Sequence, residues 1–253
     1  MKKKSLINKL NLILLFIIAI IIIVIIVYLN FIKTNIIEKY EEKNIPIYVI
    51  SLKKRKDRRE HIIKEFNKFN IKNWKFFDAY EPTNEEMKKY PGKKKGKIGV
   101  TTSHILVWKK CIELNEPIFI FEDDIYLENF NYKDINILLN NKNLWDIVWF
   151  GHCFEDGNKK ELKRIEILKN FYKSYLPRCR HAYLLSPKGA EILLKNINFE
   201  TNGDEQMAKL INNNNIKSLS QYPPTVYQSW QKDYEKNFGS DSIIEKFVSF
   251  IKK

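Results

Sequence analysis

The feature that most constrains this chain is an uninterrupted apolar run near its N-terminus. Leu12 to Leu29 reads LILLFIIAIIIIVIIVYL and contains no charge, Gly or Pro. As a helix rising about 1.5 Å per residue, the run would be about 27 Å long, close to the hydrocarbon core of a bilayer. A cleaved signal peptide would have a shorter apolar region that ends at small residues, whereas this run ends at Tyr28-Leu29-Asn30. We therefore expect a retained transmembrane anchor over residues 12–29.

Charge is distributed unequally on the two sides of this run. Four lysines and no acidic residue precede it, while the stretch after it mixes Lys with Glu. Because basic flanks stay on the cytosolic side, we expect residues 1–11 to be a cytosolic tail and residues 30–44 a stem. The working domain, residues 45–253, would then lie across the membrane, as in a single-pass type II protein.

Composition narrows the class of protein further. Hydrophobic residues make up 44% of the chain, which argues against a disordered protein, and three Cys are too few for a Cys-rich zinc module. A bond between Cys153 and Cys179 is compatible with an oxidising lumen. The net charge of +14 suggests an anionic partner, without separating nucleic acid, membrane and phosphorylated substrate.

Beyond residue 44, short apolar runs alternate with helical patterns, which indicates a single α/β domain with a largely parallel sheet. A helix is expected from Arg58 to Asn70 with Asp57 as its N-cap, another from Gly99 to Leu114, and a third after Ser186-Pro187. An amphipathic helix is expected at Ile243–Ile251. The expected strands are Ile45–Leu52, Trp74–Phe77, Ile118–Phe121, Ile147–Phe150, Ala182–Ser186 and Ile216–Leu219.

The sharpest local feature is FIFEDD, residues 119–124, where an apolar strand runs into three carboxylates. Ligands of open α/β sheets bind at the carboxyl ends of strands. In an extended chain Glu122 and Asp124 point to one side and Asp123 to the other. All-oxygen ligands suit Mn²⁺ or Mg²⁺. A solvated acidic loop is an equally good interpretation of the triplet alone.

Basic clusters follow the first expected strand and precede the Gly99 helix. They are residues 53–59 (KKRKDRR) and 93–97 (KKKGK). Anions are favoured at helix starts, so a positive rim around a carboxylate–metal centre would suit a nucleotide diphosphate. Taken singly, each cluster is more often a solvated surface.

Six ordered blocks give the chain a resemblance to a known family. They are IYVISLKKRKDRRE, GKIGVTTSHILVWKKC, FIFEDDI, HAYLLSPKGAEILL, GDEQM, and YPPTVYQ followed by GSDS. In this order they resemble glycosyltransferase family 25, which includes bacterial lipopolysaccharide glycosyltransferases and the procollagen galactosyltransferases. The sequence departs from the family's pattern at Val100, where the family often has Cys.

The resemblance implies a GT-A (Rossmann-like) fold, a UDP-sugar donor and a metal-dependent, inverting transfer of a hexose. Galactose and glucose are the favoured hexoses. The acceptor would be a hydroxyl on a glycan or a protein. Glu122 and Asp124 take the place of the metal ligands, with Mn²⁺ or Mg²⁺ bound. UDP-sugars are cytosolic in bacteria, so the expected topology favours the ER or Golgi lumen of a eukaryotic or virus-infected cell.

Inversion needs a carboxylate that takes the proton of the acceptor hydroxyl. Asp204 and Glu205 of the GDEQM block are the candidates. The alternative for Asp204 is a plain helix N-cap.

The remaining candidates are assigned to the donor. Arg55, Arg58 and Asp78 are expected to hold phosphate and ribose, and Ser240 and Asp241 to support the donor side. His181, in an apolar strand, is expected to be structural. The full set of expected substrate- or nucleotide-binding residues is Arg55, Arg58, Asp78, Lys97, His104, Asp123, Ser240 and Asp241.

Two other classes of protein remain to be weighed. One is a catalytically inactive, membrane-anchored protein that keeps the fold and binds a glycan. The other is a basic nucleic-acid binder, which the apolar run and the lack of a nucleic-acid module oppose, so no nucleic-acid partner is expected.

Overall fold

The computed structural model of the chain describes residues 16–31, 45–153 and 163–231. The chain divides into two units, Met1–Lys43 and Asn44–Lys253. In the first unit, residues 16–31 form a helix with exposed side chains. Across the described residues, no helix combines the length and the apolar character needed to cross a bilayer. Residues 12–15 of the expected anchor and the expected helix Ile243–Ile251 lie outside the described residues.

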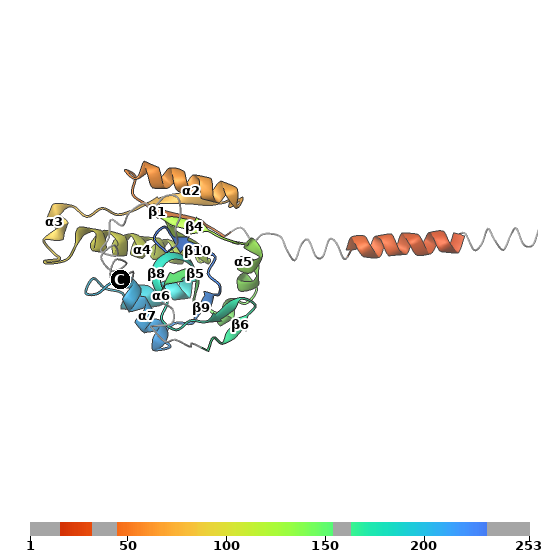
Figure 1. Cartoon of the computed structure of the whole chain (residues 1–253). Helices are drawn as coiled ribbons and strands as arrows, with labels where there is room; N and C mark the ends of the chain where they lie inside the picture. The colour runs from red at the N-terminus through yellow and green to blue at the C-terminus, as the bar shows by residue number, and fades with distance from the viewer. Residues whose placement is uncertain (1–15, 32–44, 154–162, 232–253) are drawn as a thin grey trace, which may run out of the picture. The chain divides into compact units, whose positions relative to one another are not determined.

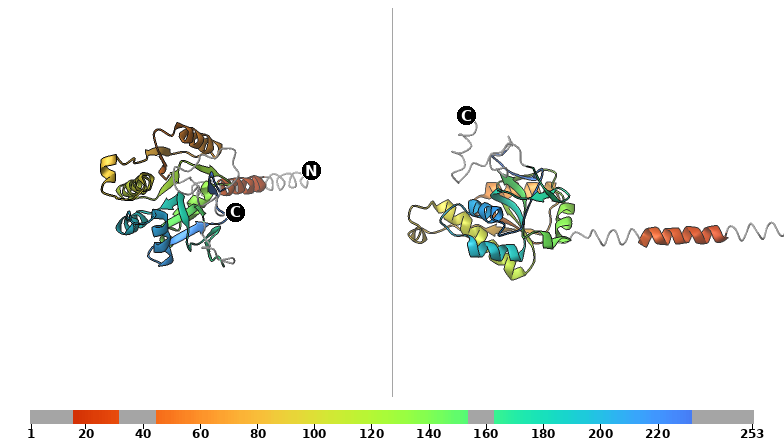
Figure 2. Two further views of the ribbon diagram at one scale, coloured as in Figure 1. Left: turned by 60° about the vertical axis from the view of Figure 1, so that its left-hand side comes forward. Right: turned by 90° about the horizontal axis from the view of Figure 1, so that it is seen from below.

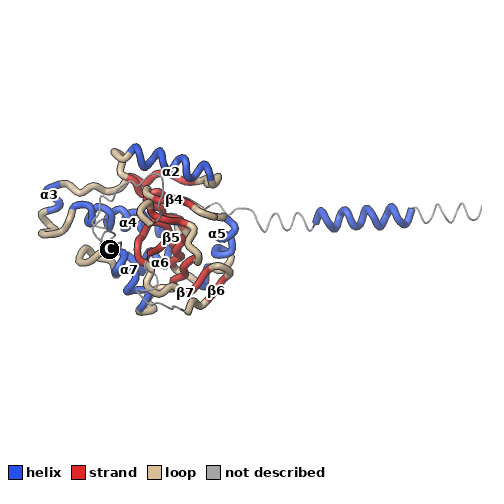
Figure 3. Tube along the Cα trace, in the orientation of Figure 1, coloured by secondary structure: helices blue, strands red, loops and turns tan. Residues whose placement is uncertain are grey.

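The second unit is a mixed α/β domain. Its strands gather at the centre with the helices around them (Figures 1 and 3). The strands are β1 (Ile47–Ser51), β2 (Trp74–Asp78), β3 (Ile118–Glu122), β4 (Ile125–Leu127), β5 (Ile147–Cys153), β6 (Glu166–Leu168), β7 (Phe171–Lys173), β8 (Arg178–Leu185), β9 (Ser218–Gln221) and β10 (Val226–Gln228). The helices are α2 (Lys56–Lys68), α3 (Asn84–Met87), α4 (Lys95–Leu114), α5 (Tyr132–Leu139), α6 (Pro187–Asn196) and α7 (Gly203–Asn212), with a 3₁₀ turn at Lys142–Leu144.

The main sheet has the order β2-β1-β3-β8-β5-β9-β7-β6, and β4 pairs with β10 in a small antiparallel sheet. Strand β1 is parallel to both β2 and β3, and β5 is parallel to β9. Strand β8, however, runs antiparallel between β3 and β5. The expectation of a largely parallel sheet was therefore wrong. Parallel neighbours need a long crossover, usually a helix, whereas the described chain between β5 and β8 contains the short strands β6 and β7.

Two hydrophobic cores lie on opposite faces of the sheet, because successive strand residues point to opposite sides. On one face Val49, Phe121 and Phe150 belong to the same core as residues of α2 and α5. On the other face Ile50, Ile120 and Trp149 pack with residues of α4, α6 and α7. The sheet is thus covered on both faces, as the views in Figure 2 also show.

Most expected elements are confirmed, but two helix starts differ. Helix α2 begins at Lys56 with Arg55 as N-cap, so Asp57 lies inside the helix, where Arg55 Nε and Nη2 donate to its carboxylate at 3.0 and 2.9 Å. Helix α4 begins at Lys95, and Gly99 lies inside it. A Cβ at Gly99 would come within 2.8 Å of the Tyr80 carbonyl oxygen, so the glycine admits a close backbone approach. The expected N-cap Ser186 is confirmed, since its hydroxyl accepts from Gly189 N–H at 3.0 Å.

Candidate active site

The three carboxylates at the acidic end of β3 have different partners. Glu122 and Asp124 both accept from the amide of Gln228, at the end of β10, at 3.3 Å each. Asp123 instead accepts from Nη1 of Arg58, on α2, at 2.8 Å. Two carboxylates therefore converge on Gln228, while the third forms a buried ion pair with Arg58, whose Nη1 also lies 3.8 Å from Asp124 Oδ2.

Burial has a large effect on the two converging acids. It is the main cause that raises the pKa of Glu122 to about 7, with the Asp123 charge adding to it and Arg180 opposing it. Burial and then the Glu122 charge raise the pKa of Asp124 to about 7 as well. Two neighbouring buried carboxylates without a cation repel each other, so a divalent cation between them would favour their ionised forms. The pair thus fits a hard cation by ligand type and by convergence.

A chain of hydrogen bonds supports Glu122 on the face of the sheet that α4 covers. Trp108 Nε1 donates to the Tyr183 hydroxyl at 2.8 Å, and this hydroxyl lies 2.7 Å from His104 Nδ1. His104 Nε2 lies 3.1 Å from Glu122 Oε1. Burial lowers the pKa of His104 well below its ordinary value, so the ring is neutral near pH 7. The tautomer that satisfies each bond then accepts from Tyr183 at Nδ1 and donates to Glu122 from Nε2.

The start of α7 contributes a second acidic position. The N-cap of α7 is Asn202, whose side chain makes no capping hydrogen bond, so the alternative interpretation of Asp204 as the N-cap is wrong. Asp204 lies in the first turn with Glu205, and its Oδ2 accepts from Cys179 N–H at 3.3 Å. The Asp204 charge also acts on His104 and Glu122, which places it electrostatically in the same site.

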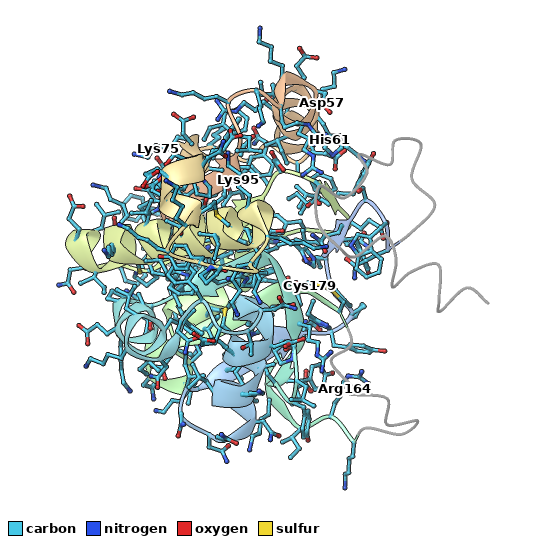
Figure 4. The ribbon with its side chains drawn as sticks, turned by 90° about the vertical axis from the view of Figure 1, so that its left-hand side faces the viewer. Asp57, His61, Lys75, Lys95, Arg164 and Cys179 are labelled. Carbon is cyan, nitrogen blue, oxygen red and sulfur yellow. A yellow bond between two sulfur atoms is a disulfide. The ribbon has the colours of Figure 1, made fainter. Side chains whose placement is uncertain are left out.

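Cys179 is joined to Cys153 by a disulfide bond. Cys153 ends β5, and Cys179 is the second residue of β8, so the bond ties two neighbouring strands at the edge where β3 ends. Figure 4 labels Cys179 near the middle of the domain, with Arg164 towards its periphery. Within the described ranges, the one cluster of three possible metal-ligating side chains is Cys153, Cys179 and His181. Its two sulfurs are in the disulfide, so they are not available as thiolate ligands.

The other expected donor-binding residues lie at the same sheet edge or at its rim. Asp78 ends β2 in register with Ser51 of β1, and its exposed carboxylate accepts from Arg59 Nη2 at 2.7 Å. That hydrogen bond is the main cause that lowers the pKa of Asp78. Arg55 binds Asp57, and Lys97 is half-buried in the first turn of α4. The structure therefore brings Arg58, His104, Asp123 and Asp204 to the acidic pair, but not Arg55. Ser240 and Asp241 lie outside the described residues.

Four residues that line this centre were not singled out from the sequence: Trp108, Arg180, Tyr183 and Gln228. Trp108, Tyr183 and Gln228 lie in the family-like blocks and Arg180 directly precedes one, yet nothing in the local pattern marks them. Tyr183 and Trp108 have the spacing of ordinary core residues, and Gln228 is 106 residues away from Glu122 along the chain. Only the fold brings them together.

Comparison with known proteins gives a consistent result. The family profile described as Glycosyltransferase family 25 (LPS biosynthesis protein) matches residues 44–207. A putative glycosyltransferase of Haemophilus influenzae is 35% identical over 164 residues, covering 58% of this chain and 56% of that protein. Procollagen galactosyltransferase 1-B of Xenopus laevis is 27% identical over 220 residues, covering 78% of this chain and 33% of that protein. The chain thus spans about half of the first relative's length and a third of the second's.

The lipooligosaccharide biosynthesis protein lic2B of Haemophilus influenzae is similar at a comparable level, 34% identity over 157 residues, with 58% of this chain and 53% of that protein covered. Among solved structures, A197 from STIV aligns with a TM-score of 0.41 and 8% identity over 79% of this chain and 100% of that chain. That structural similarity is too low to assign a shared fold.

Proposed function

The chain belongs to glycosyltransferase family 25, and from this premise we propose that it transfers a hexose from a UDP-sugar to an acceptor hydroxyl, with inversion, on a GT-A fold. Glycosyltransferases need a sugar donor and an acceptor, and the acidic end of β3 is where we propose that the donor binds. Galactose or glucose is the favoured sugar, and a glycan or protein the favoured acceptor.

Glu122 and Asp124 are the residues that would hold Mn²⁺ or Mg²⁺, because their half-buried carboxylates converge on one amide. The ion, when bound, would neutralise charge on the donor's diphosphate. His104 would keep Glu122 in position by donating from Nε2, and it would resist protonation because it is buried. Arg58 would hold Asp123 away from the ion.

Asp204 is the proposed general base. In an inverting transfer the acceptor oxygen bonds to the anomeric carbon, the bond from that carbon to the phosphate oxygen breaks, and the bonding electrons leave with UDP. The acceptor's proton passes to a carboxylate. Asp204 suits this step because it is half-buried in the first turn of α7, and its charge acts on Glu122 across the site. A positioned base contributes about 10²–10⁴-fold to the rate.

The observation that carries this proposal is the shared contact of Glu122 and Asp124 with Gln228, beside the His104–Tyr183–Trp108 chain. A solvated acidic loop would need none of these partners. The test is hydrolysis and transfer with UDP-galactose, UDP-glucose, UDP-GlcNAc and UDP-GalNAc, with and without Mn²⁺. Metal-dependent release of UDP from one donor supports the proposal, and no release from any donor contradicts it.

We further propose that residues 12–29 anchor the chain in a membrane with residues 45–253 in an oxidising lumen. The apolar run and its basic N-terminal flank support the anchor, and the Cys153–Cys179 disulfide supports the oxidising compartment. Protease protection in sealed microsomes tests the topology. A protected domain agrees with it, and digestion of the domain from the cytosolic side contradicts it.

A further inference from the structure

Arg180 is a buried cation of this site to which the proposed function gives no role. Its side chain belongs to a residue that is 7% exposed, and within the described part of the chain its buried Nη1 has no hydrogen-bond partner. A buried charge without a hydrogen-bond partner is costly, because the interior does not replace the water it loses. Such a group is retained where a bound ligand of opposite charge supplies the missing partner.

The direction of β8 brings Arg180 to the acidic end of β3. The two strands are antiparallel, with Phe121 opposite Ala182, so the start of β8 lies where β3 ends. The charge of Arg180 opposes the burial that raises the pKa of Glu122, and it acts on His104 as well. Arg180 therefore lies within electrostatic reach of the proposed metal ligands.

Arg180 also lies against the first residue of α7. A Cβ built on Gly203 would be 2.3 Å from Arg180 Nη1, so only glycine lets the guanidinium rest there. The helix begins without a side-chain cap. Free backbone N–H groups and the helix dipole make such a start favourable for an anion. Two independent features, the uncapped helix start and the Arg180 Nη1 without a hydrogen-bond partner among the described residues, thus meet at one place.

The neighbouring acids explain why a cation is needed there. Glu122, Asp124 and Asp204 all carry or can carry negative charge around this position, and together they would repel a diphosphate. Arg58 is already paired with Asp123 at 2.8 Å and lies 3.8 Å from Asp124. Arg180 is a second buried cation among the described residues of this site, and its charge can offset the repulsion.

We propose that Arg180, with the start of α7, binds a phosphate oxygen of the donor's diphosphate and stabilises the charge that UDP gains as it leaves. The inference rests on the proposed function and deepens it, since it identifies the group that recognises a nucleoside diphosphate rather than a nucleoside. The anomeric carbon's bond to the phosphate oxygen breaks, and the electron pair stays on that oxygen beside the guanidinium.

The test compares binding of UDP and of uridine, by calorimetry with Mn²⁺ present, to the full chain in detergent and to two variants. Arg180→Met should weaken UDP binding about 10- to 100-fold, the range for a hydrogen bond to a charged group, and leave uridine binding unchanged. Arg178→Met is the matched control, because Arg178 lies on the same strand but is exposed, and it should bind both ligands as the wild type does. Unchanged UDP affinity in Arg180→Met overturns the inference.

Other outcomes are also decisive. Unchanged UDP affinity with a raised KM for the acceptor would show that the anion belongs to the acceptor, which overturns the assignment to the donor. If Arg180→Met does not fold, Gly203→Ala takes its place, because the added methyl displaces the guanidinium without removing its charge. This variant must weaken the binding of UDP but not of uridine, and a UDP affinity equal to that of the wild type overturns the inference. If the wild type transfers sugar from UDP-sugars and Arg180→Met binds UDP normally, only the inference is rejected. If the wild type binds no UDP, the proposed function is rejected as well.

Discussion

The acidic end of β3 and the start of α7 bring carboxylates to the same site but hold them differently. All three carboxylates are half-buried, but Glu122 and Asp124 contact side chains from β10 and, for Glu122, α4. Asp204 is held by a 3.3 Å hydrogen bond from a backbone N–H. A carboxylate that binds a metal must be fixed, whereas one that takes a proton from a variable acceptor needs room. The contacts that hold each carboxylate therefore match its proposed role, metal ligand for Glu122 and Asp124 and general base for Asp204.

The largest expected effect comes from the fixed pair. Asp124→Asn keeps the shape and the contact with Gln228 but removes a charged metal ligand, so Mn²⁺-dependent turnover should fall by at least about 10³-fold, the equivalent of several kcal/mol of metal stabilisation. Turnover is measured as UDP release. Glu113→Gln, an exposed change on α4, is the control and should be neutral. Wild-type turnover in Asp124→Asn, or in excess EDTA, would remove the acids from the mechanism.

A smaller loss is expected at the start of α7. Asp204→Asn should lower kcat by at least about 10²-fold, the lower end for a positioned general base, and leave UDP affinity unchanged. Both kcat and the affinity for UDP are measured for Asp204→Asn and for Glu205→Gln, which is the control at the neighbouring residue. If kcat survives in Asp204→Asn and falls in Glu205→Gln, the base is the next residue along the helix.

The supporting chain behind Glu122 should matter less than either carboxylate. Tyr183→Phe removes the hydroxyl between Trp108 and His104, so the tautomer of His104 loses its constraint. We expect activity to fall about 10-fold, the lower end for partners of metal ligands. The free energy of unfolding should fall by about 1–3 kcal/mol, because buried polar groups lose their partner. Equal activity and stability to wild type would show that the chain of hydrogen bonds has no role.

The smallest expected effect is on stability against pH. The pKa values of Glu122 and Asp124 are raised to about 7, so between about pH 4 and pH 7 the folded, metal-free chain binds protons that the unfolded chain has released. Its free energy of unfolding should therefore fall as pH rises through that range, by on the order of 1–3 kcal/mol. Urea unfolding in EDTA measures this, and Asp124→Asn should give a flatter profile. Identical profiles would mean that these acids are not perturbed by burial.

Sequence patterns predicted β1, β2, β3, β5, β8 and β9 and the Ser186-Pro187 helix start because these are local signals, but they did not predict β4, β6, β7 and β10. FIFEDD predicted a strand that ends in carboxylates, but β3 ends at Glu122, so the alternation expected of an extended chain does not reach Asp123 and Asp124. The antiparallel course of β8 was not predictable from its own residues, since direction depends on the connection that precedes it. The roles of Arg180 and Gln228 depend on contacts between distant segments, which no local pattern encodes.

The helix starts show why one kind of local rule failed. Asp57 followed three residues later by Glu60 has the pattern of a capping box, but Arg55 binds Asp57 inside the helix, and the helix begins two residues earlier than that pattern requires. At α7 the chain likewise begins the helix at Gly203, before Asp204, with the glycine packed under Arg180. In both helices an arginine contacts the first turn, and the helix begins before the residue that the capping pattern indicates.

The most direct test of the account is the release of UDP from UDP-galactose and UDP-glucose by the full chain, measured for wild type and Asp124→Asn at several Mn²⁺ concentrations. The account predicts release that rises with Mn²⁺ for one of the two donors in the wild type and is lost in the variant. Release that is independent of Mn²⁺, and equal in the two proteins, would contradict the claim that the acidic end of β3 is the metal-dependent centre of a sugar transferase.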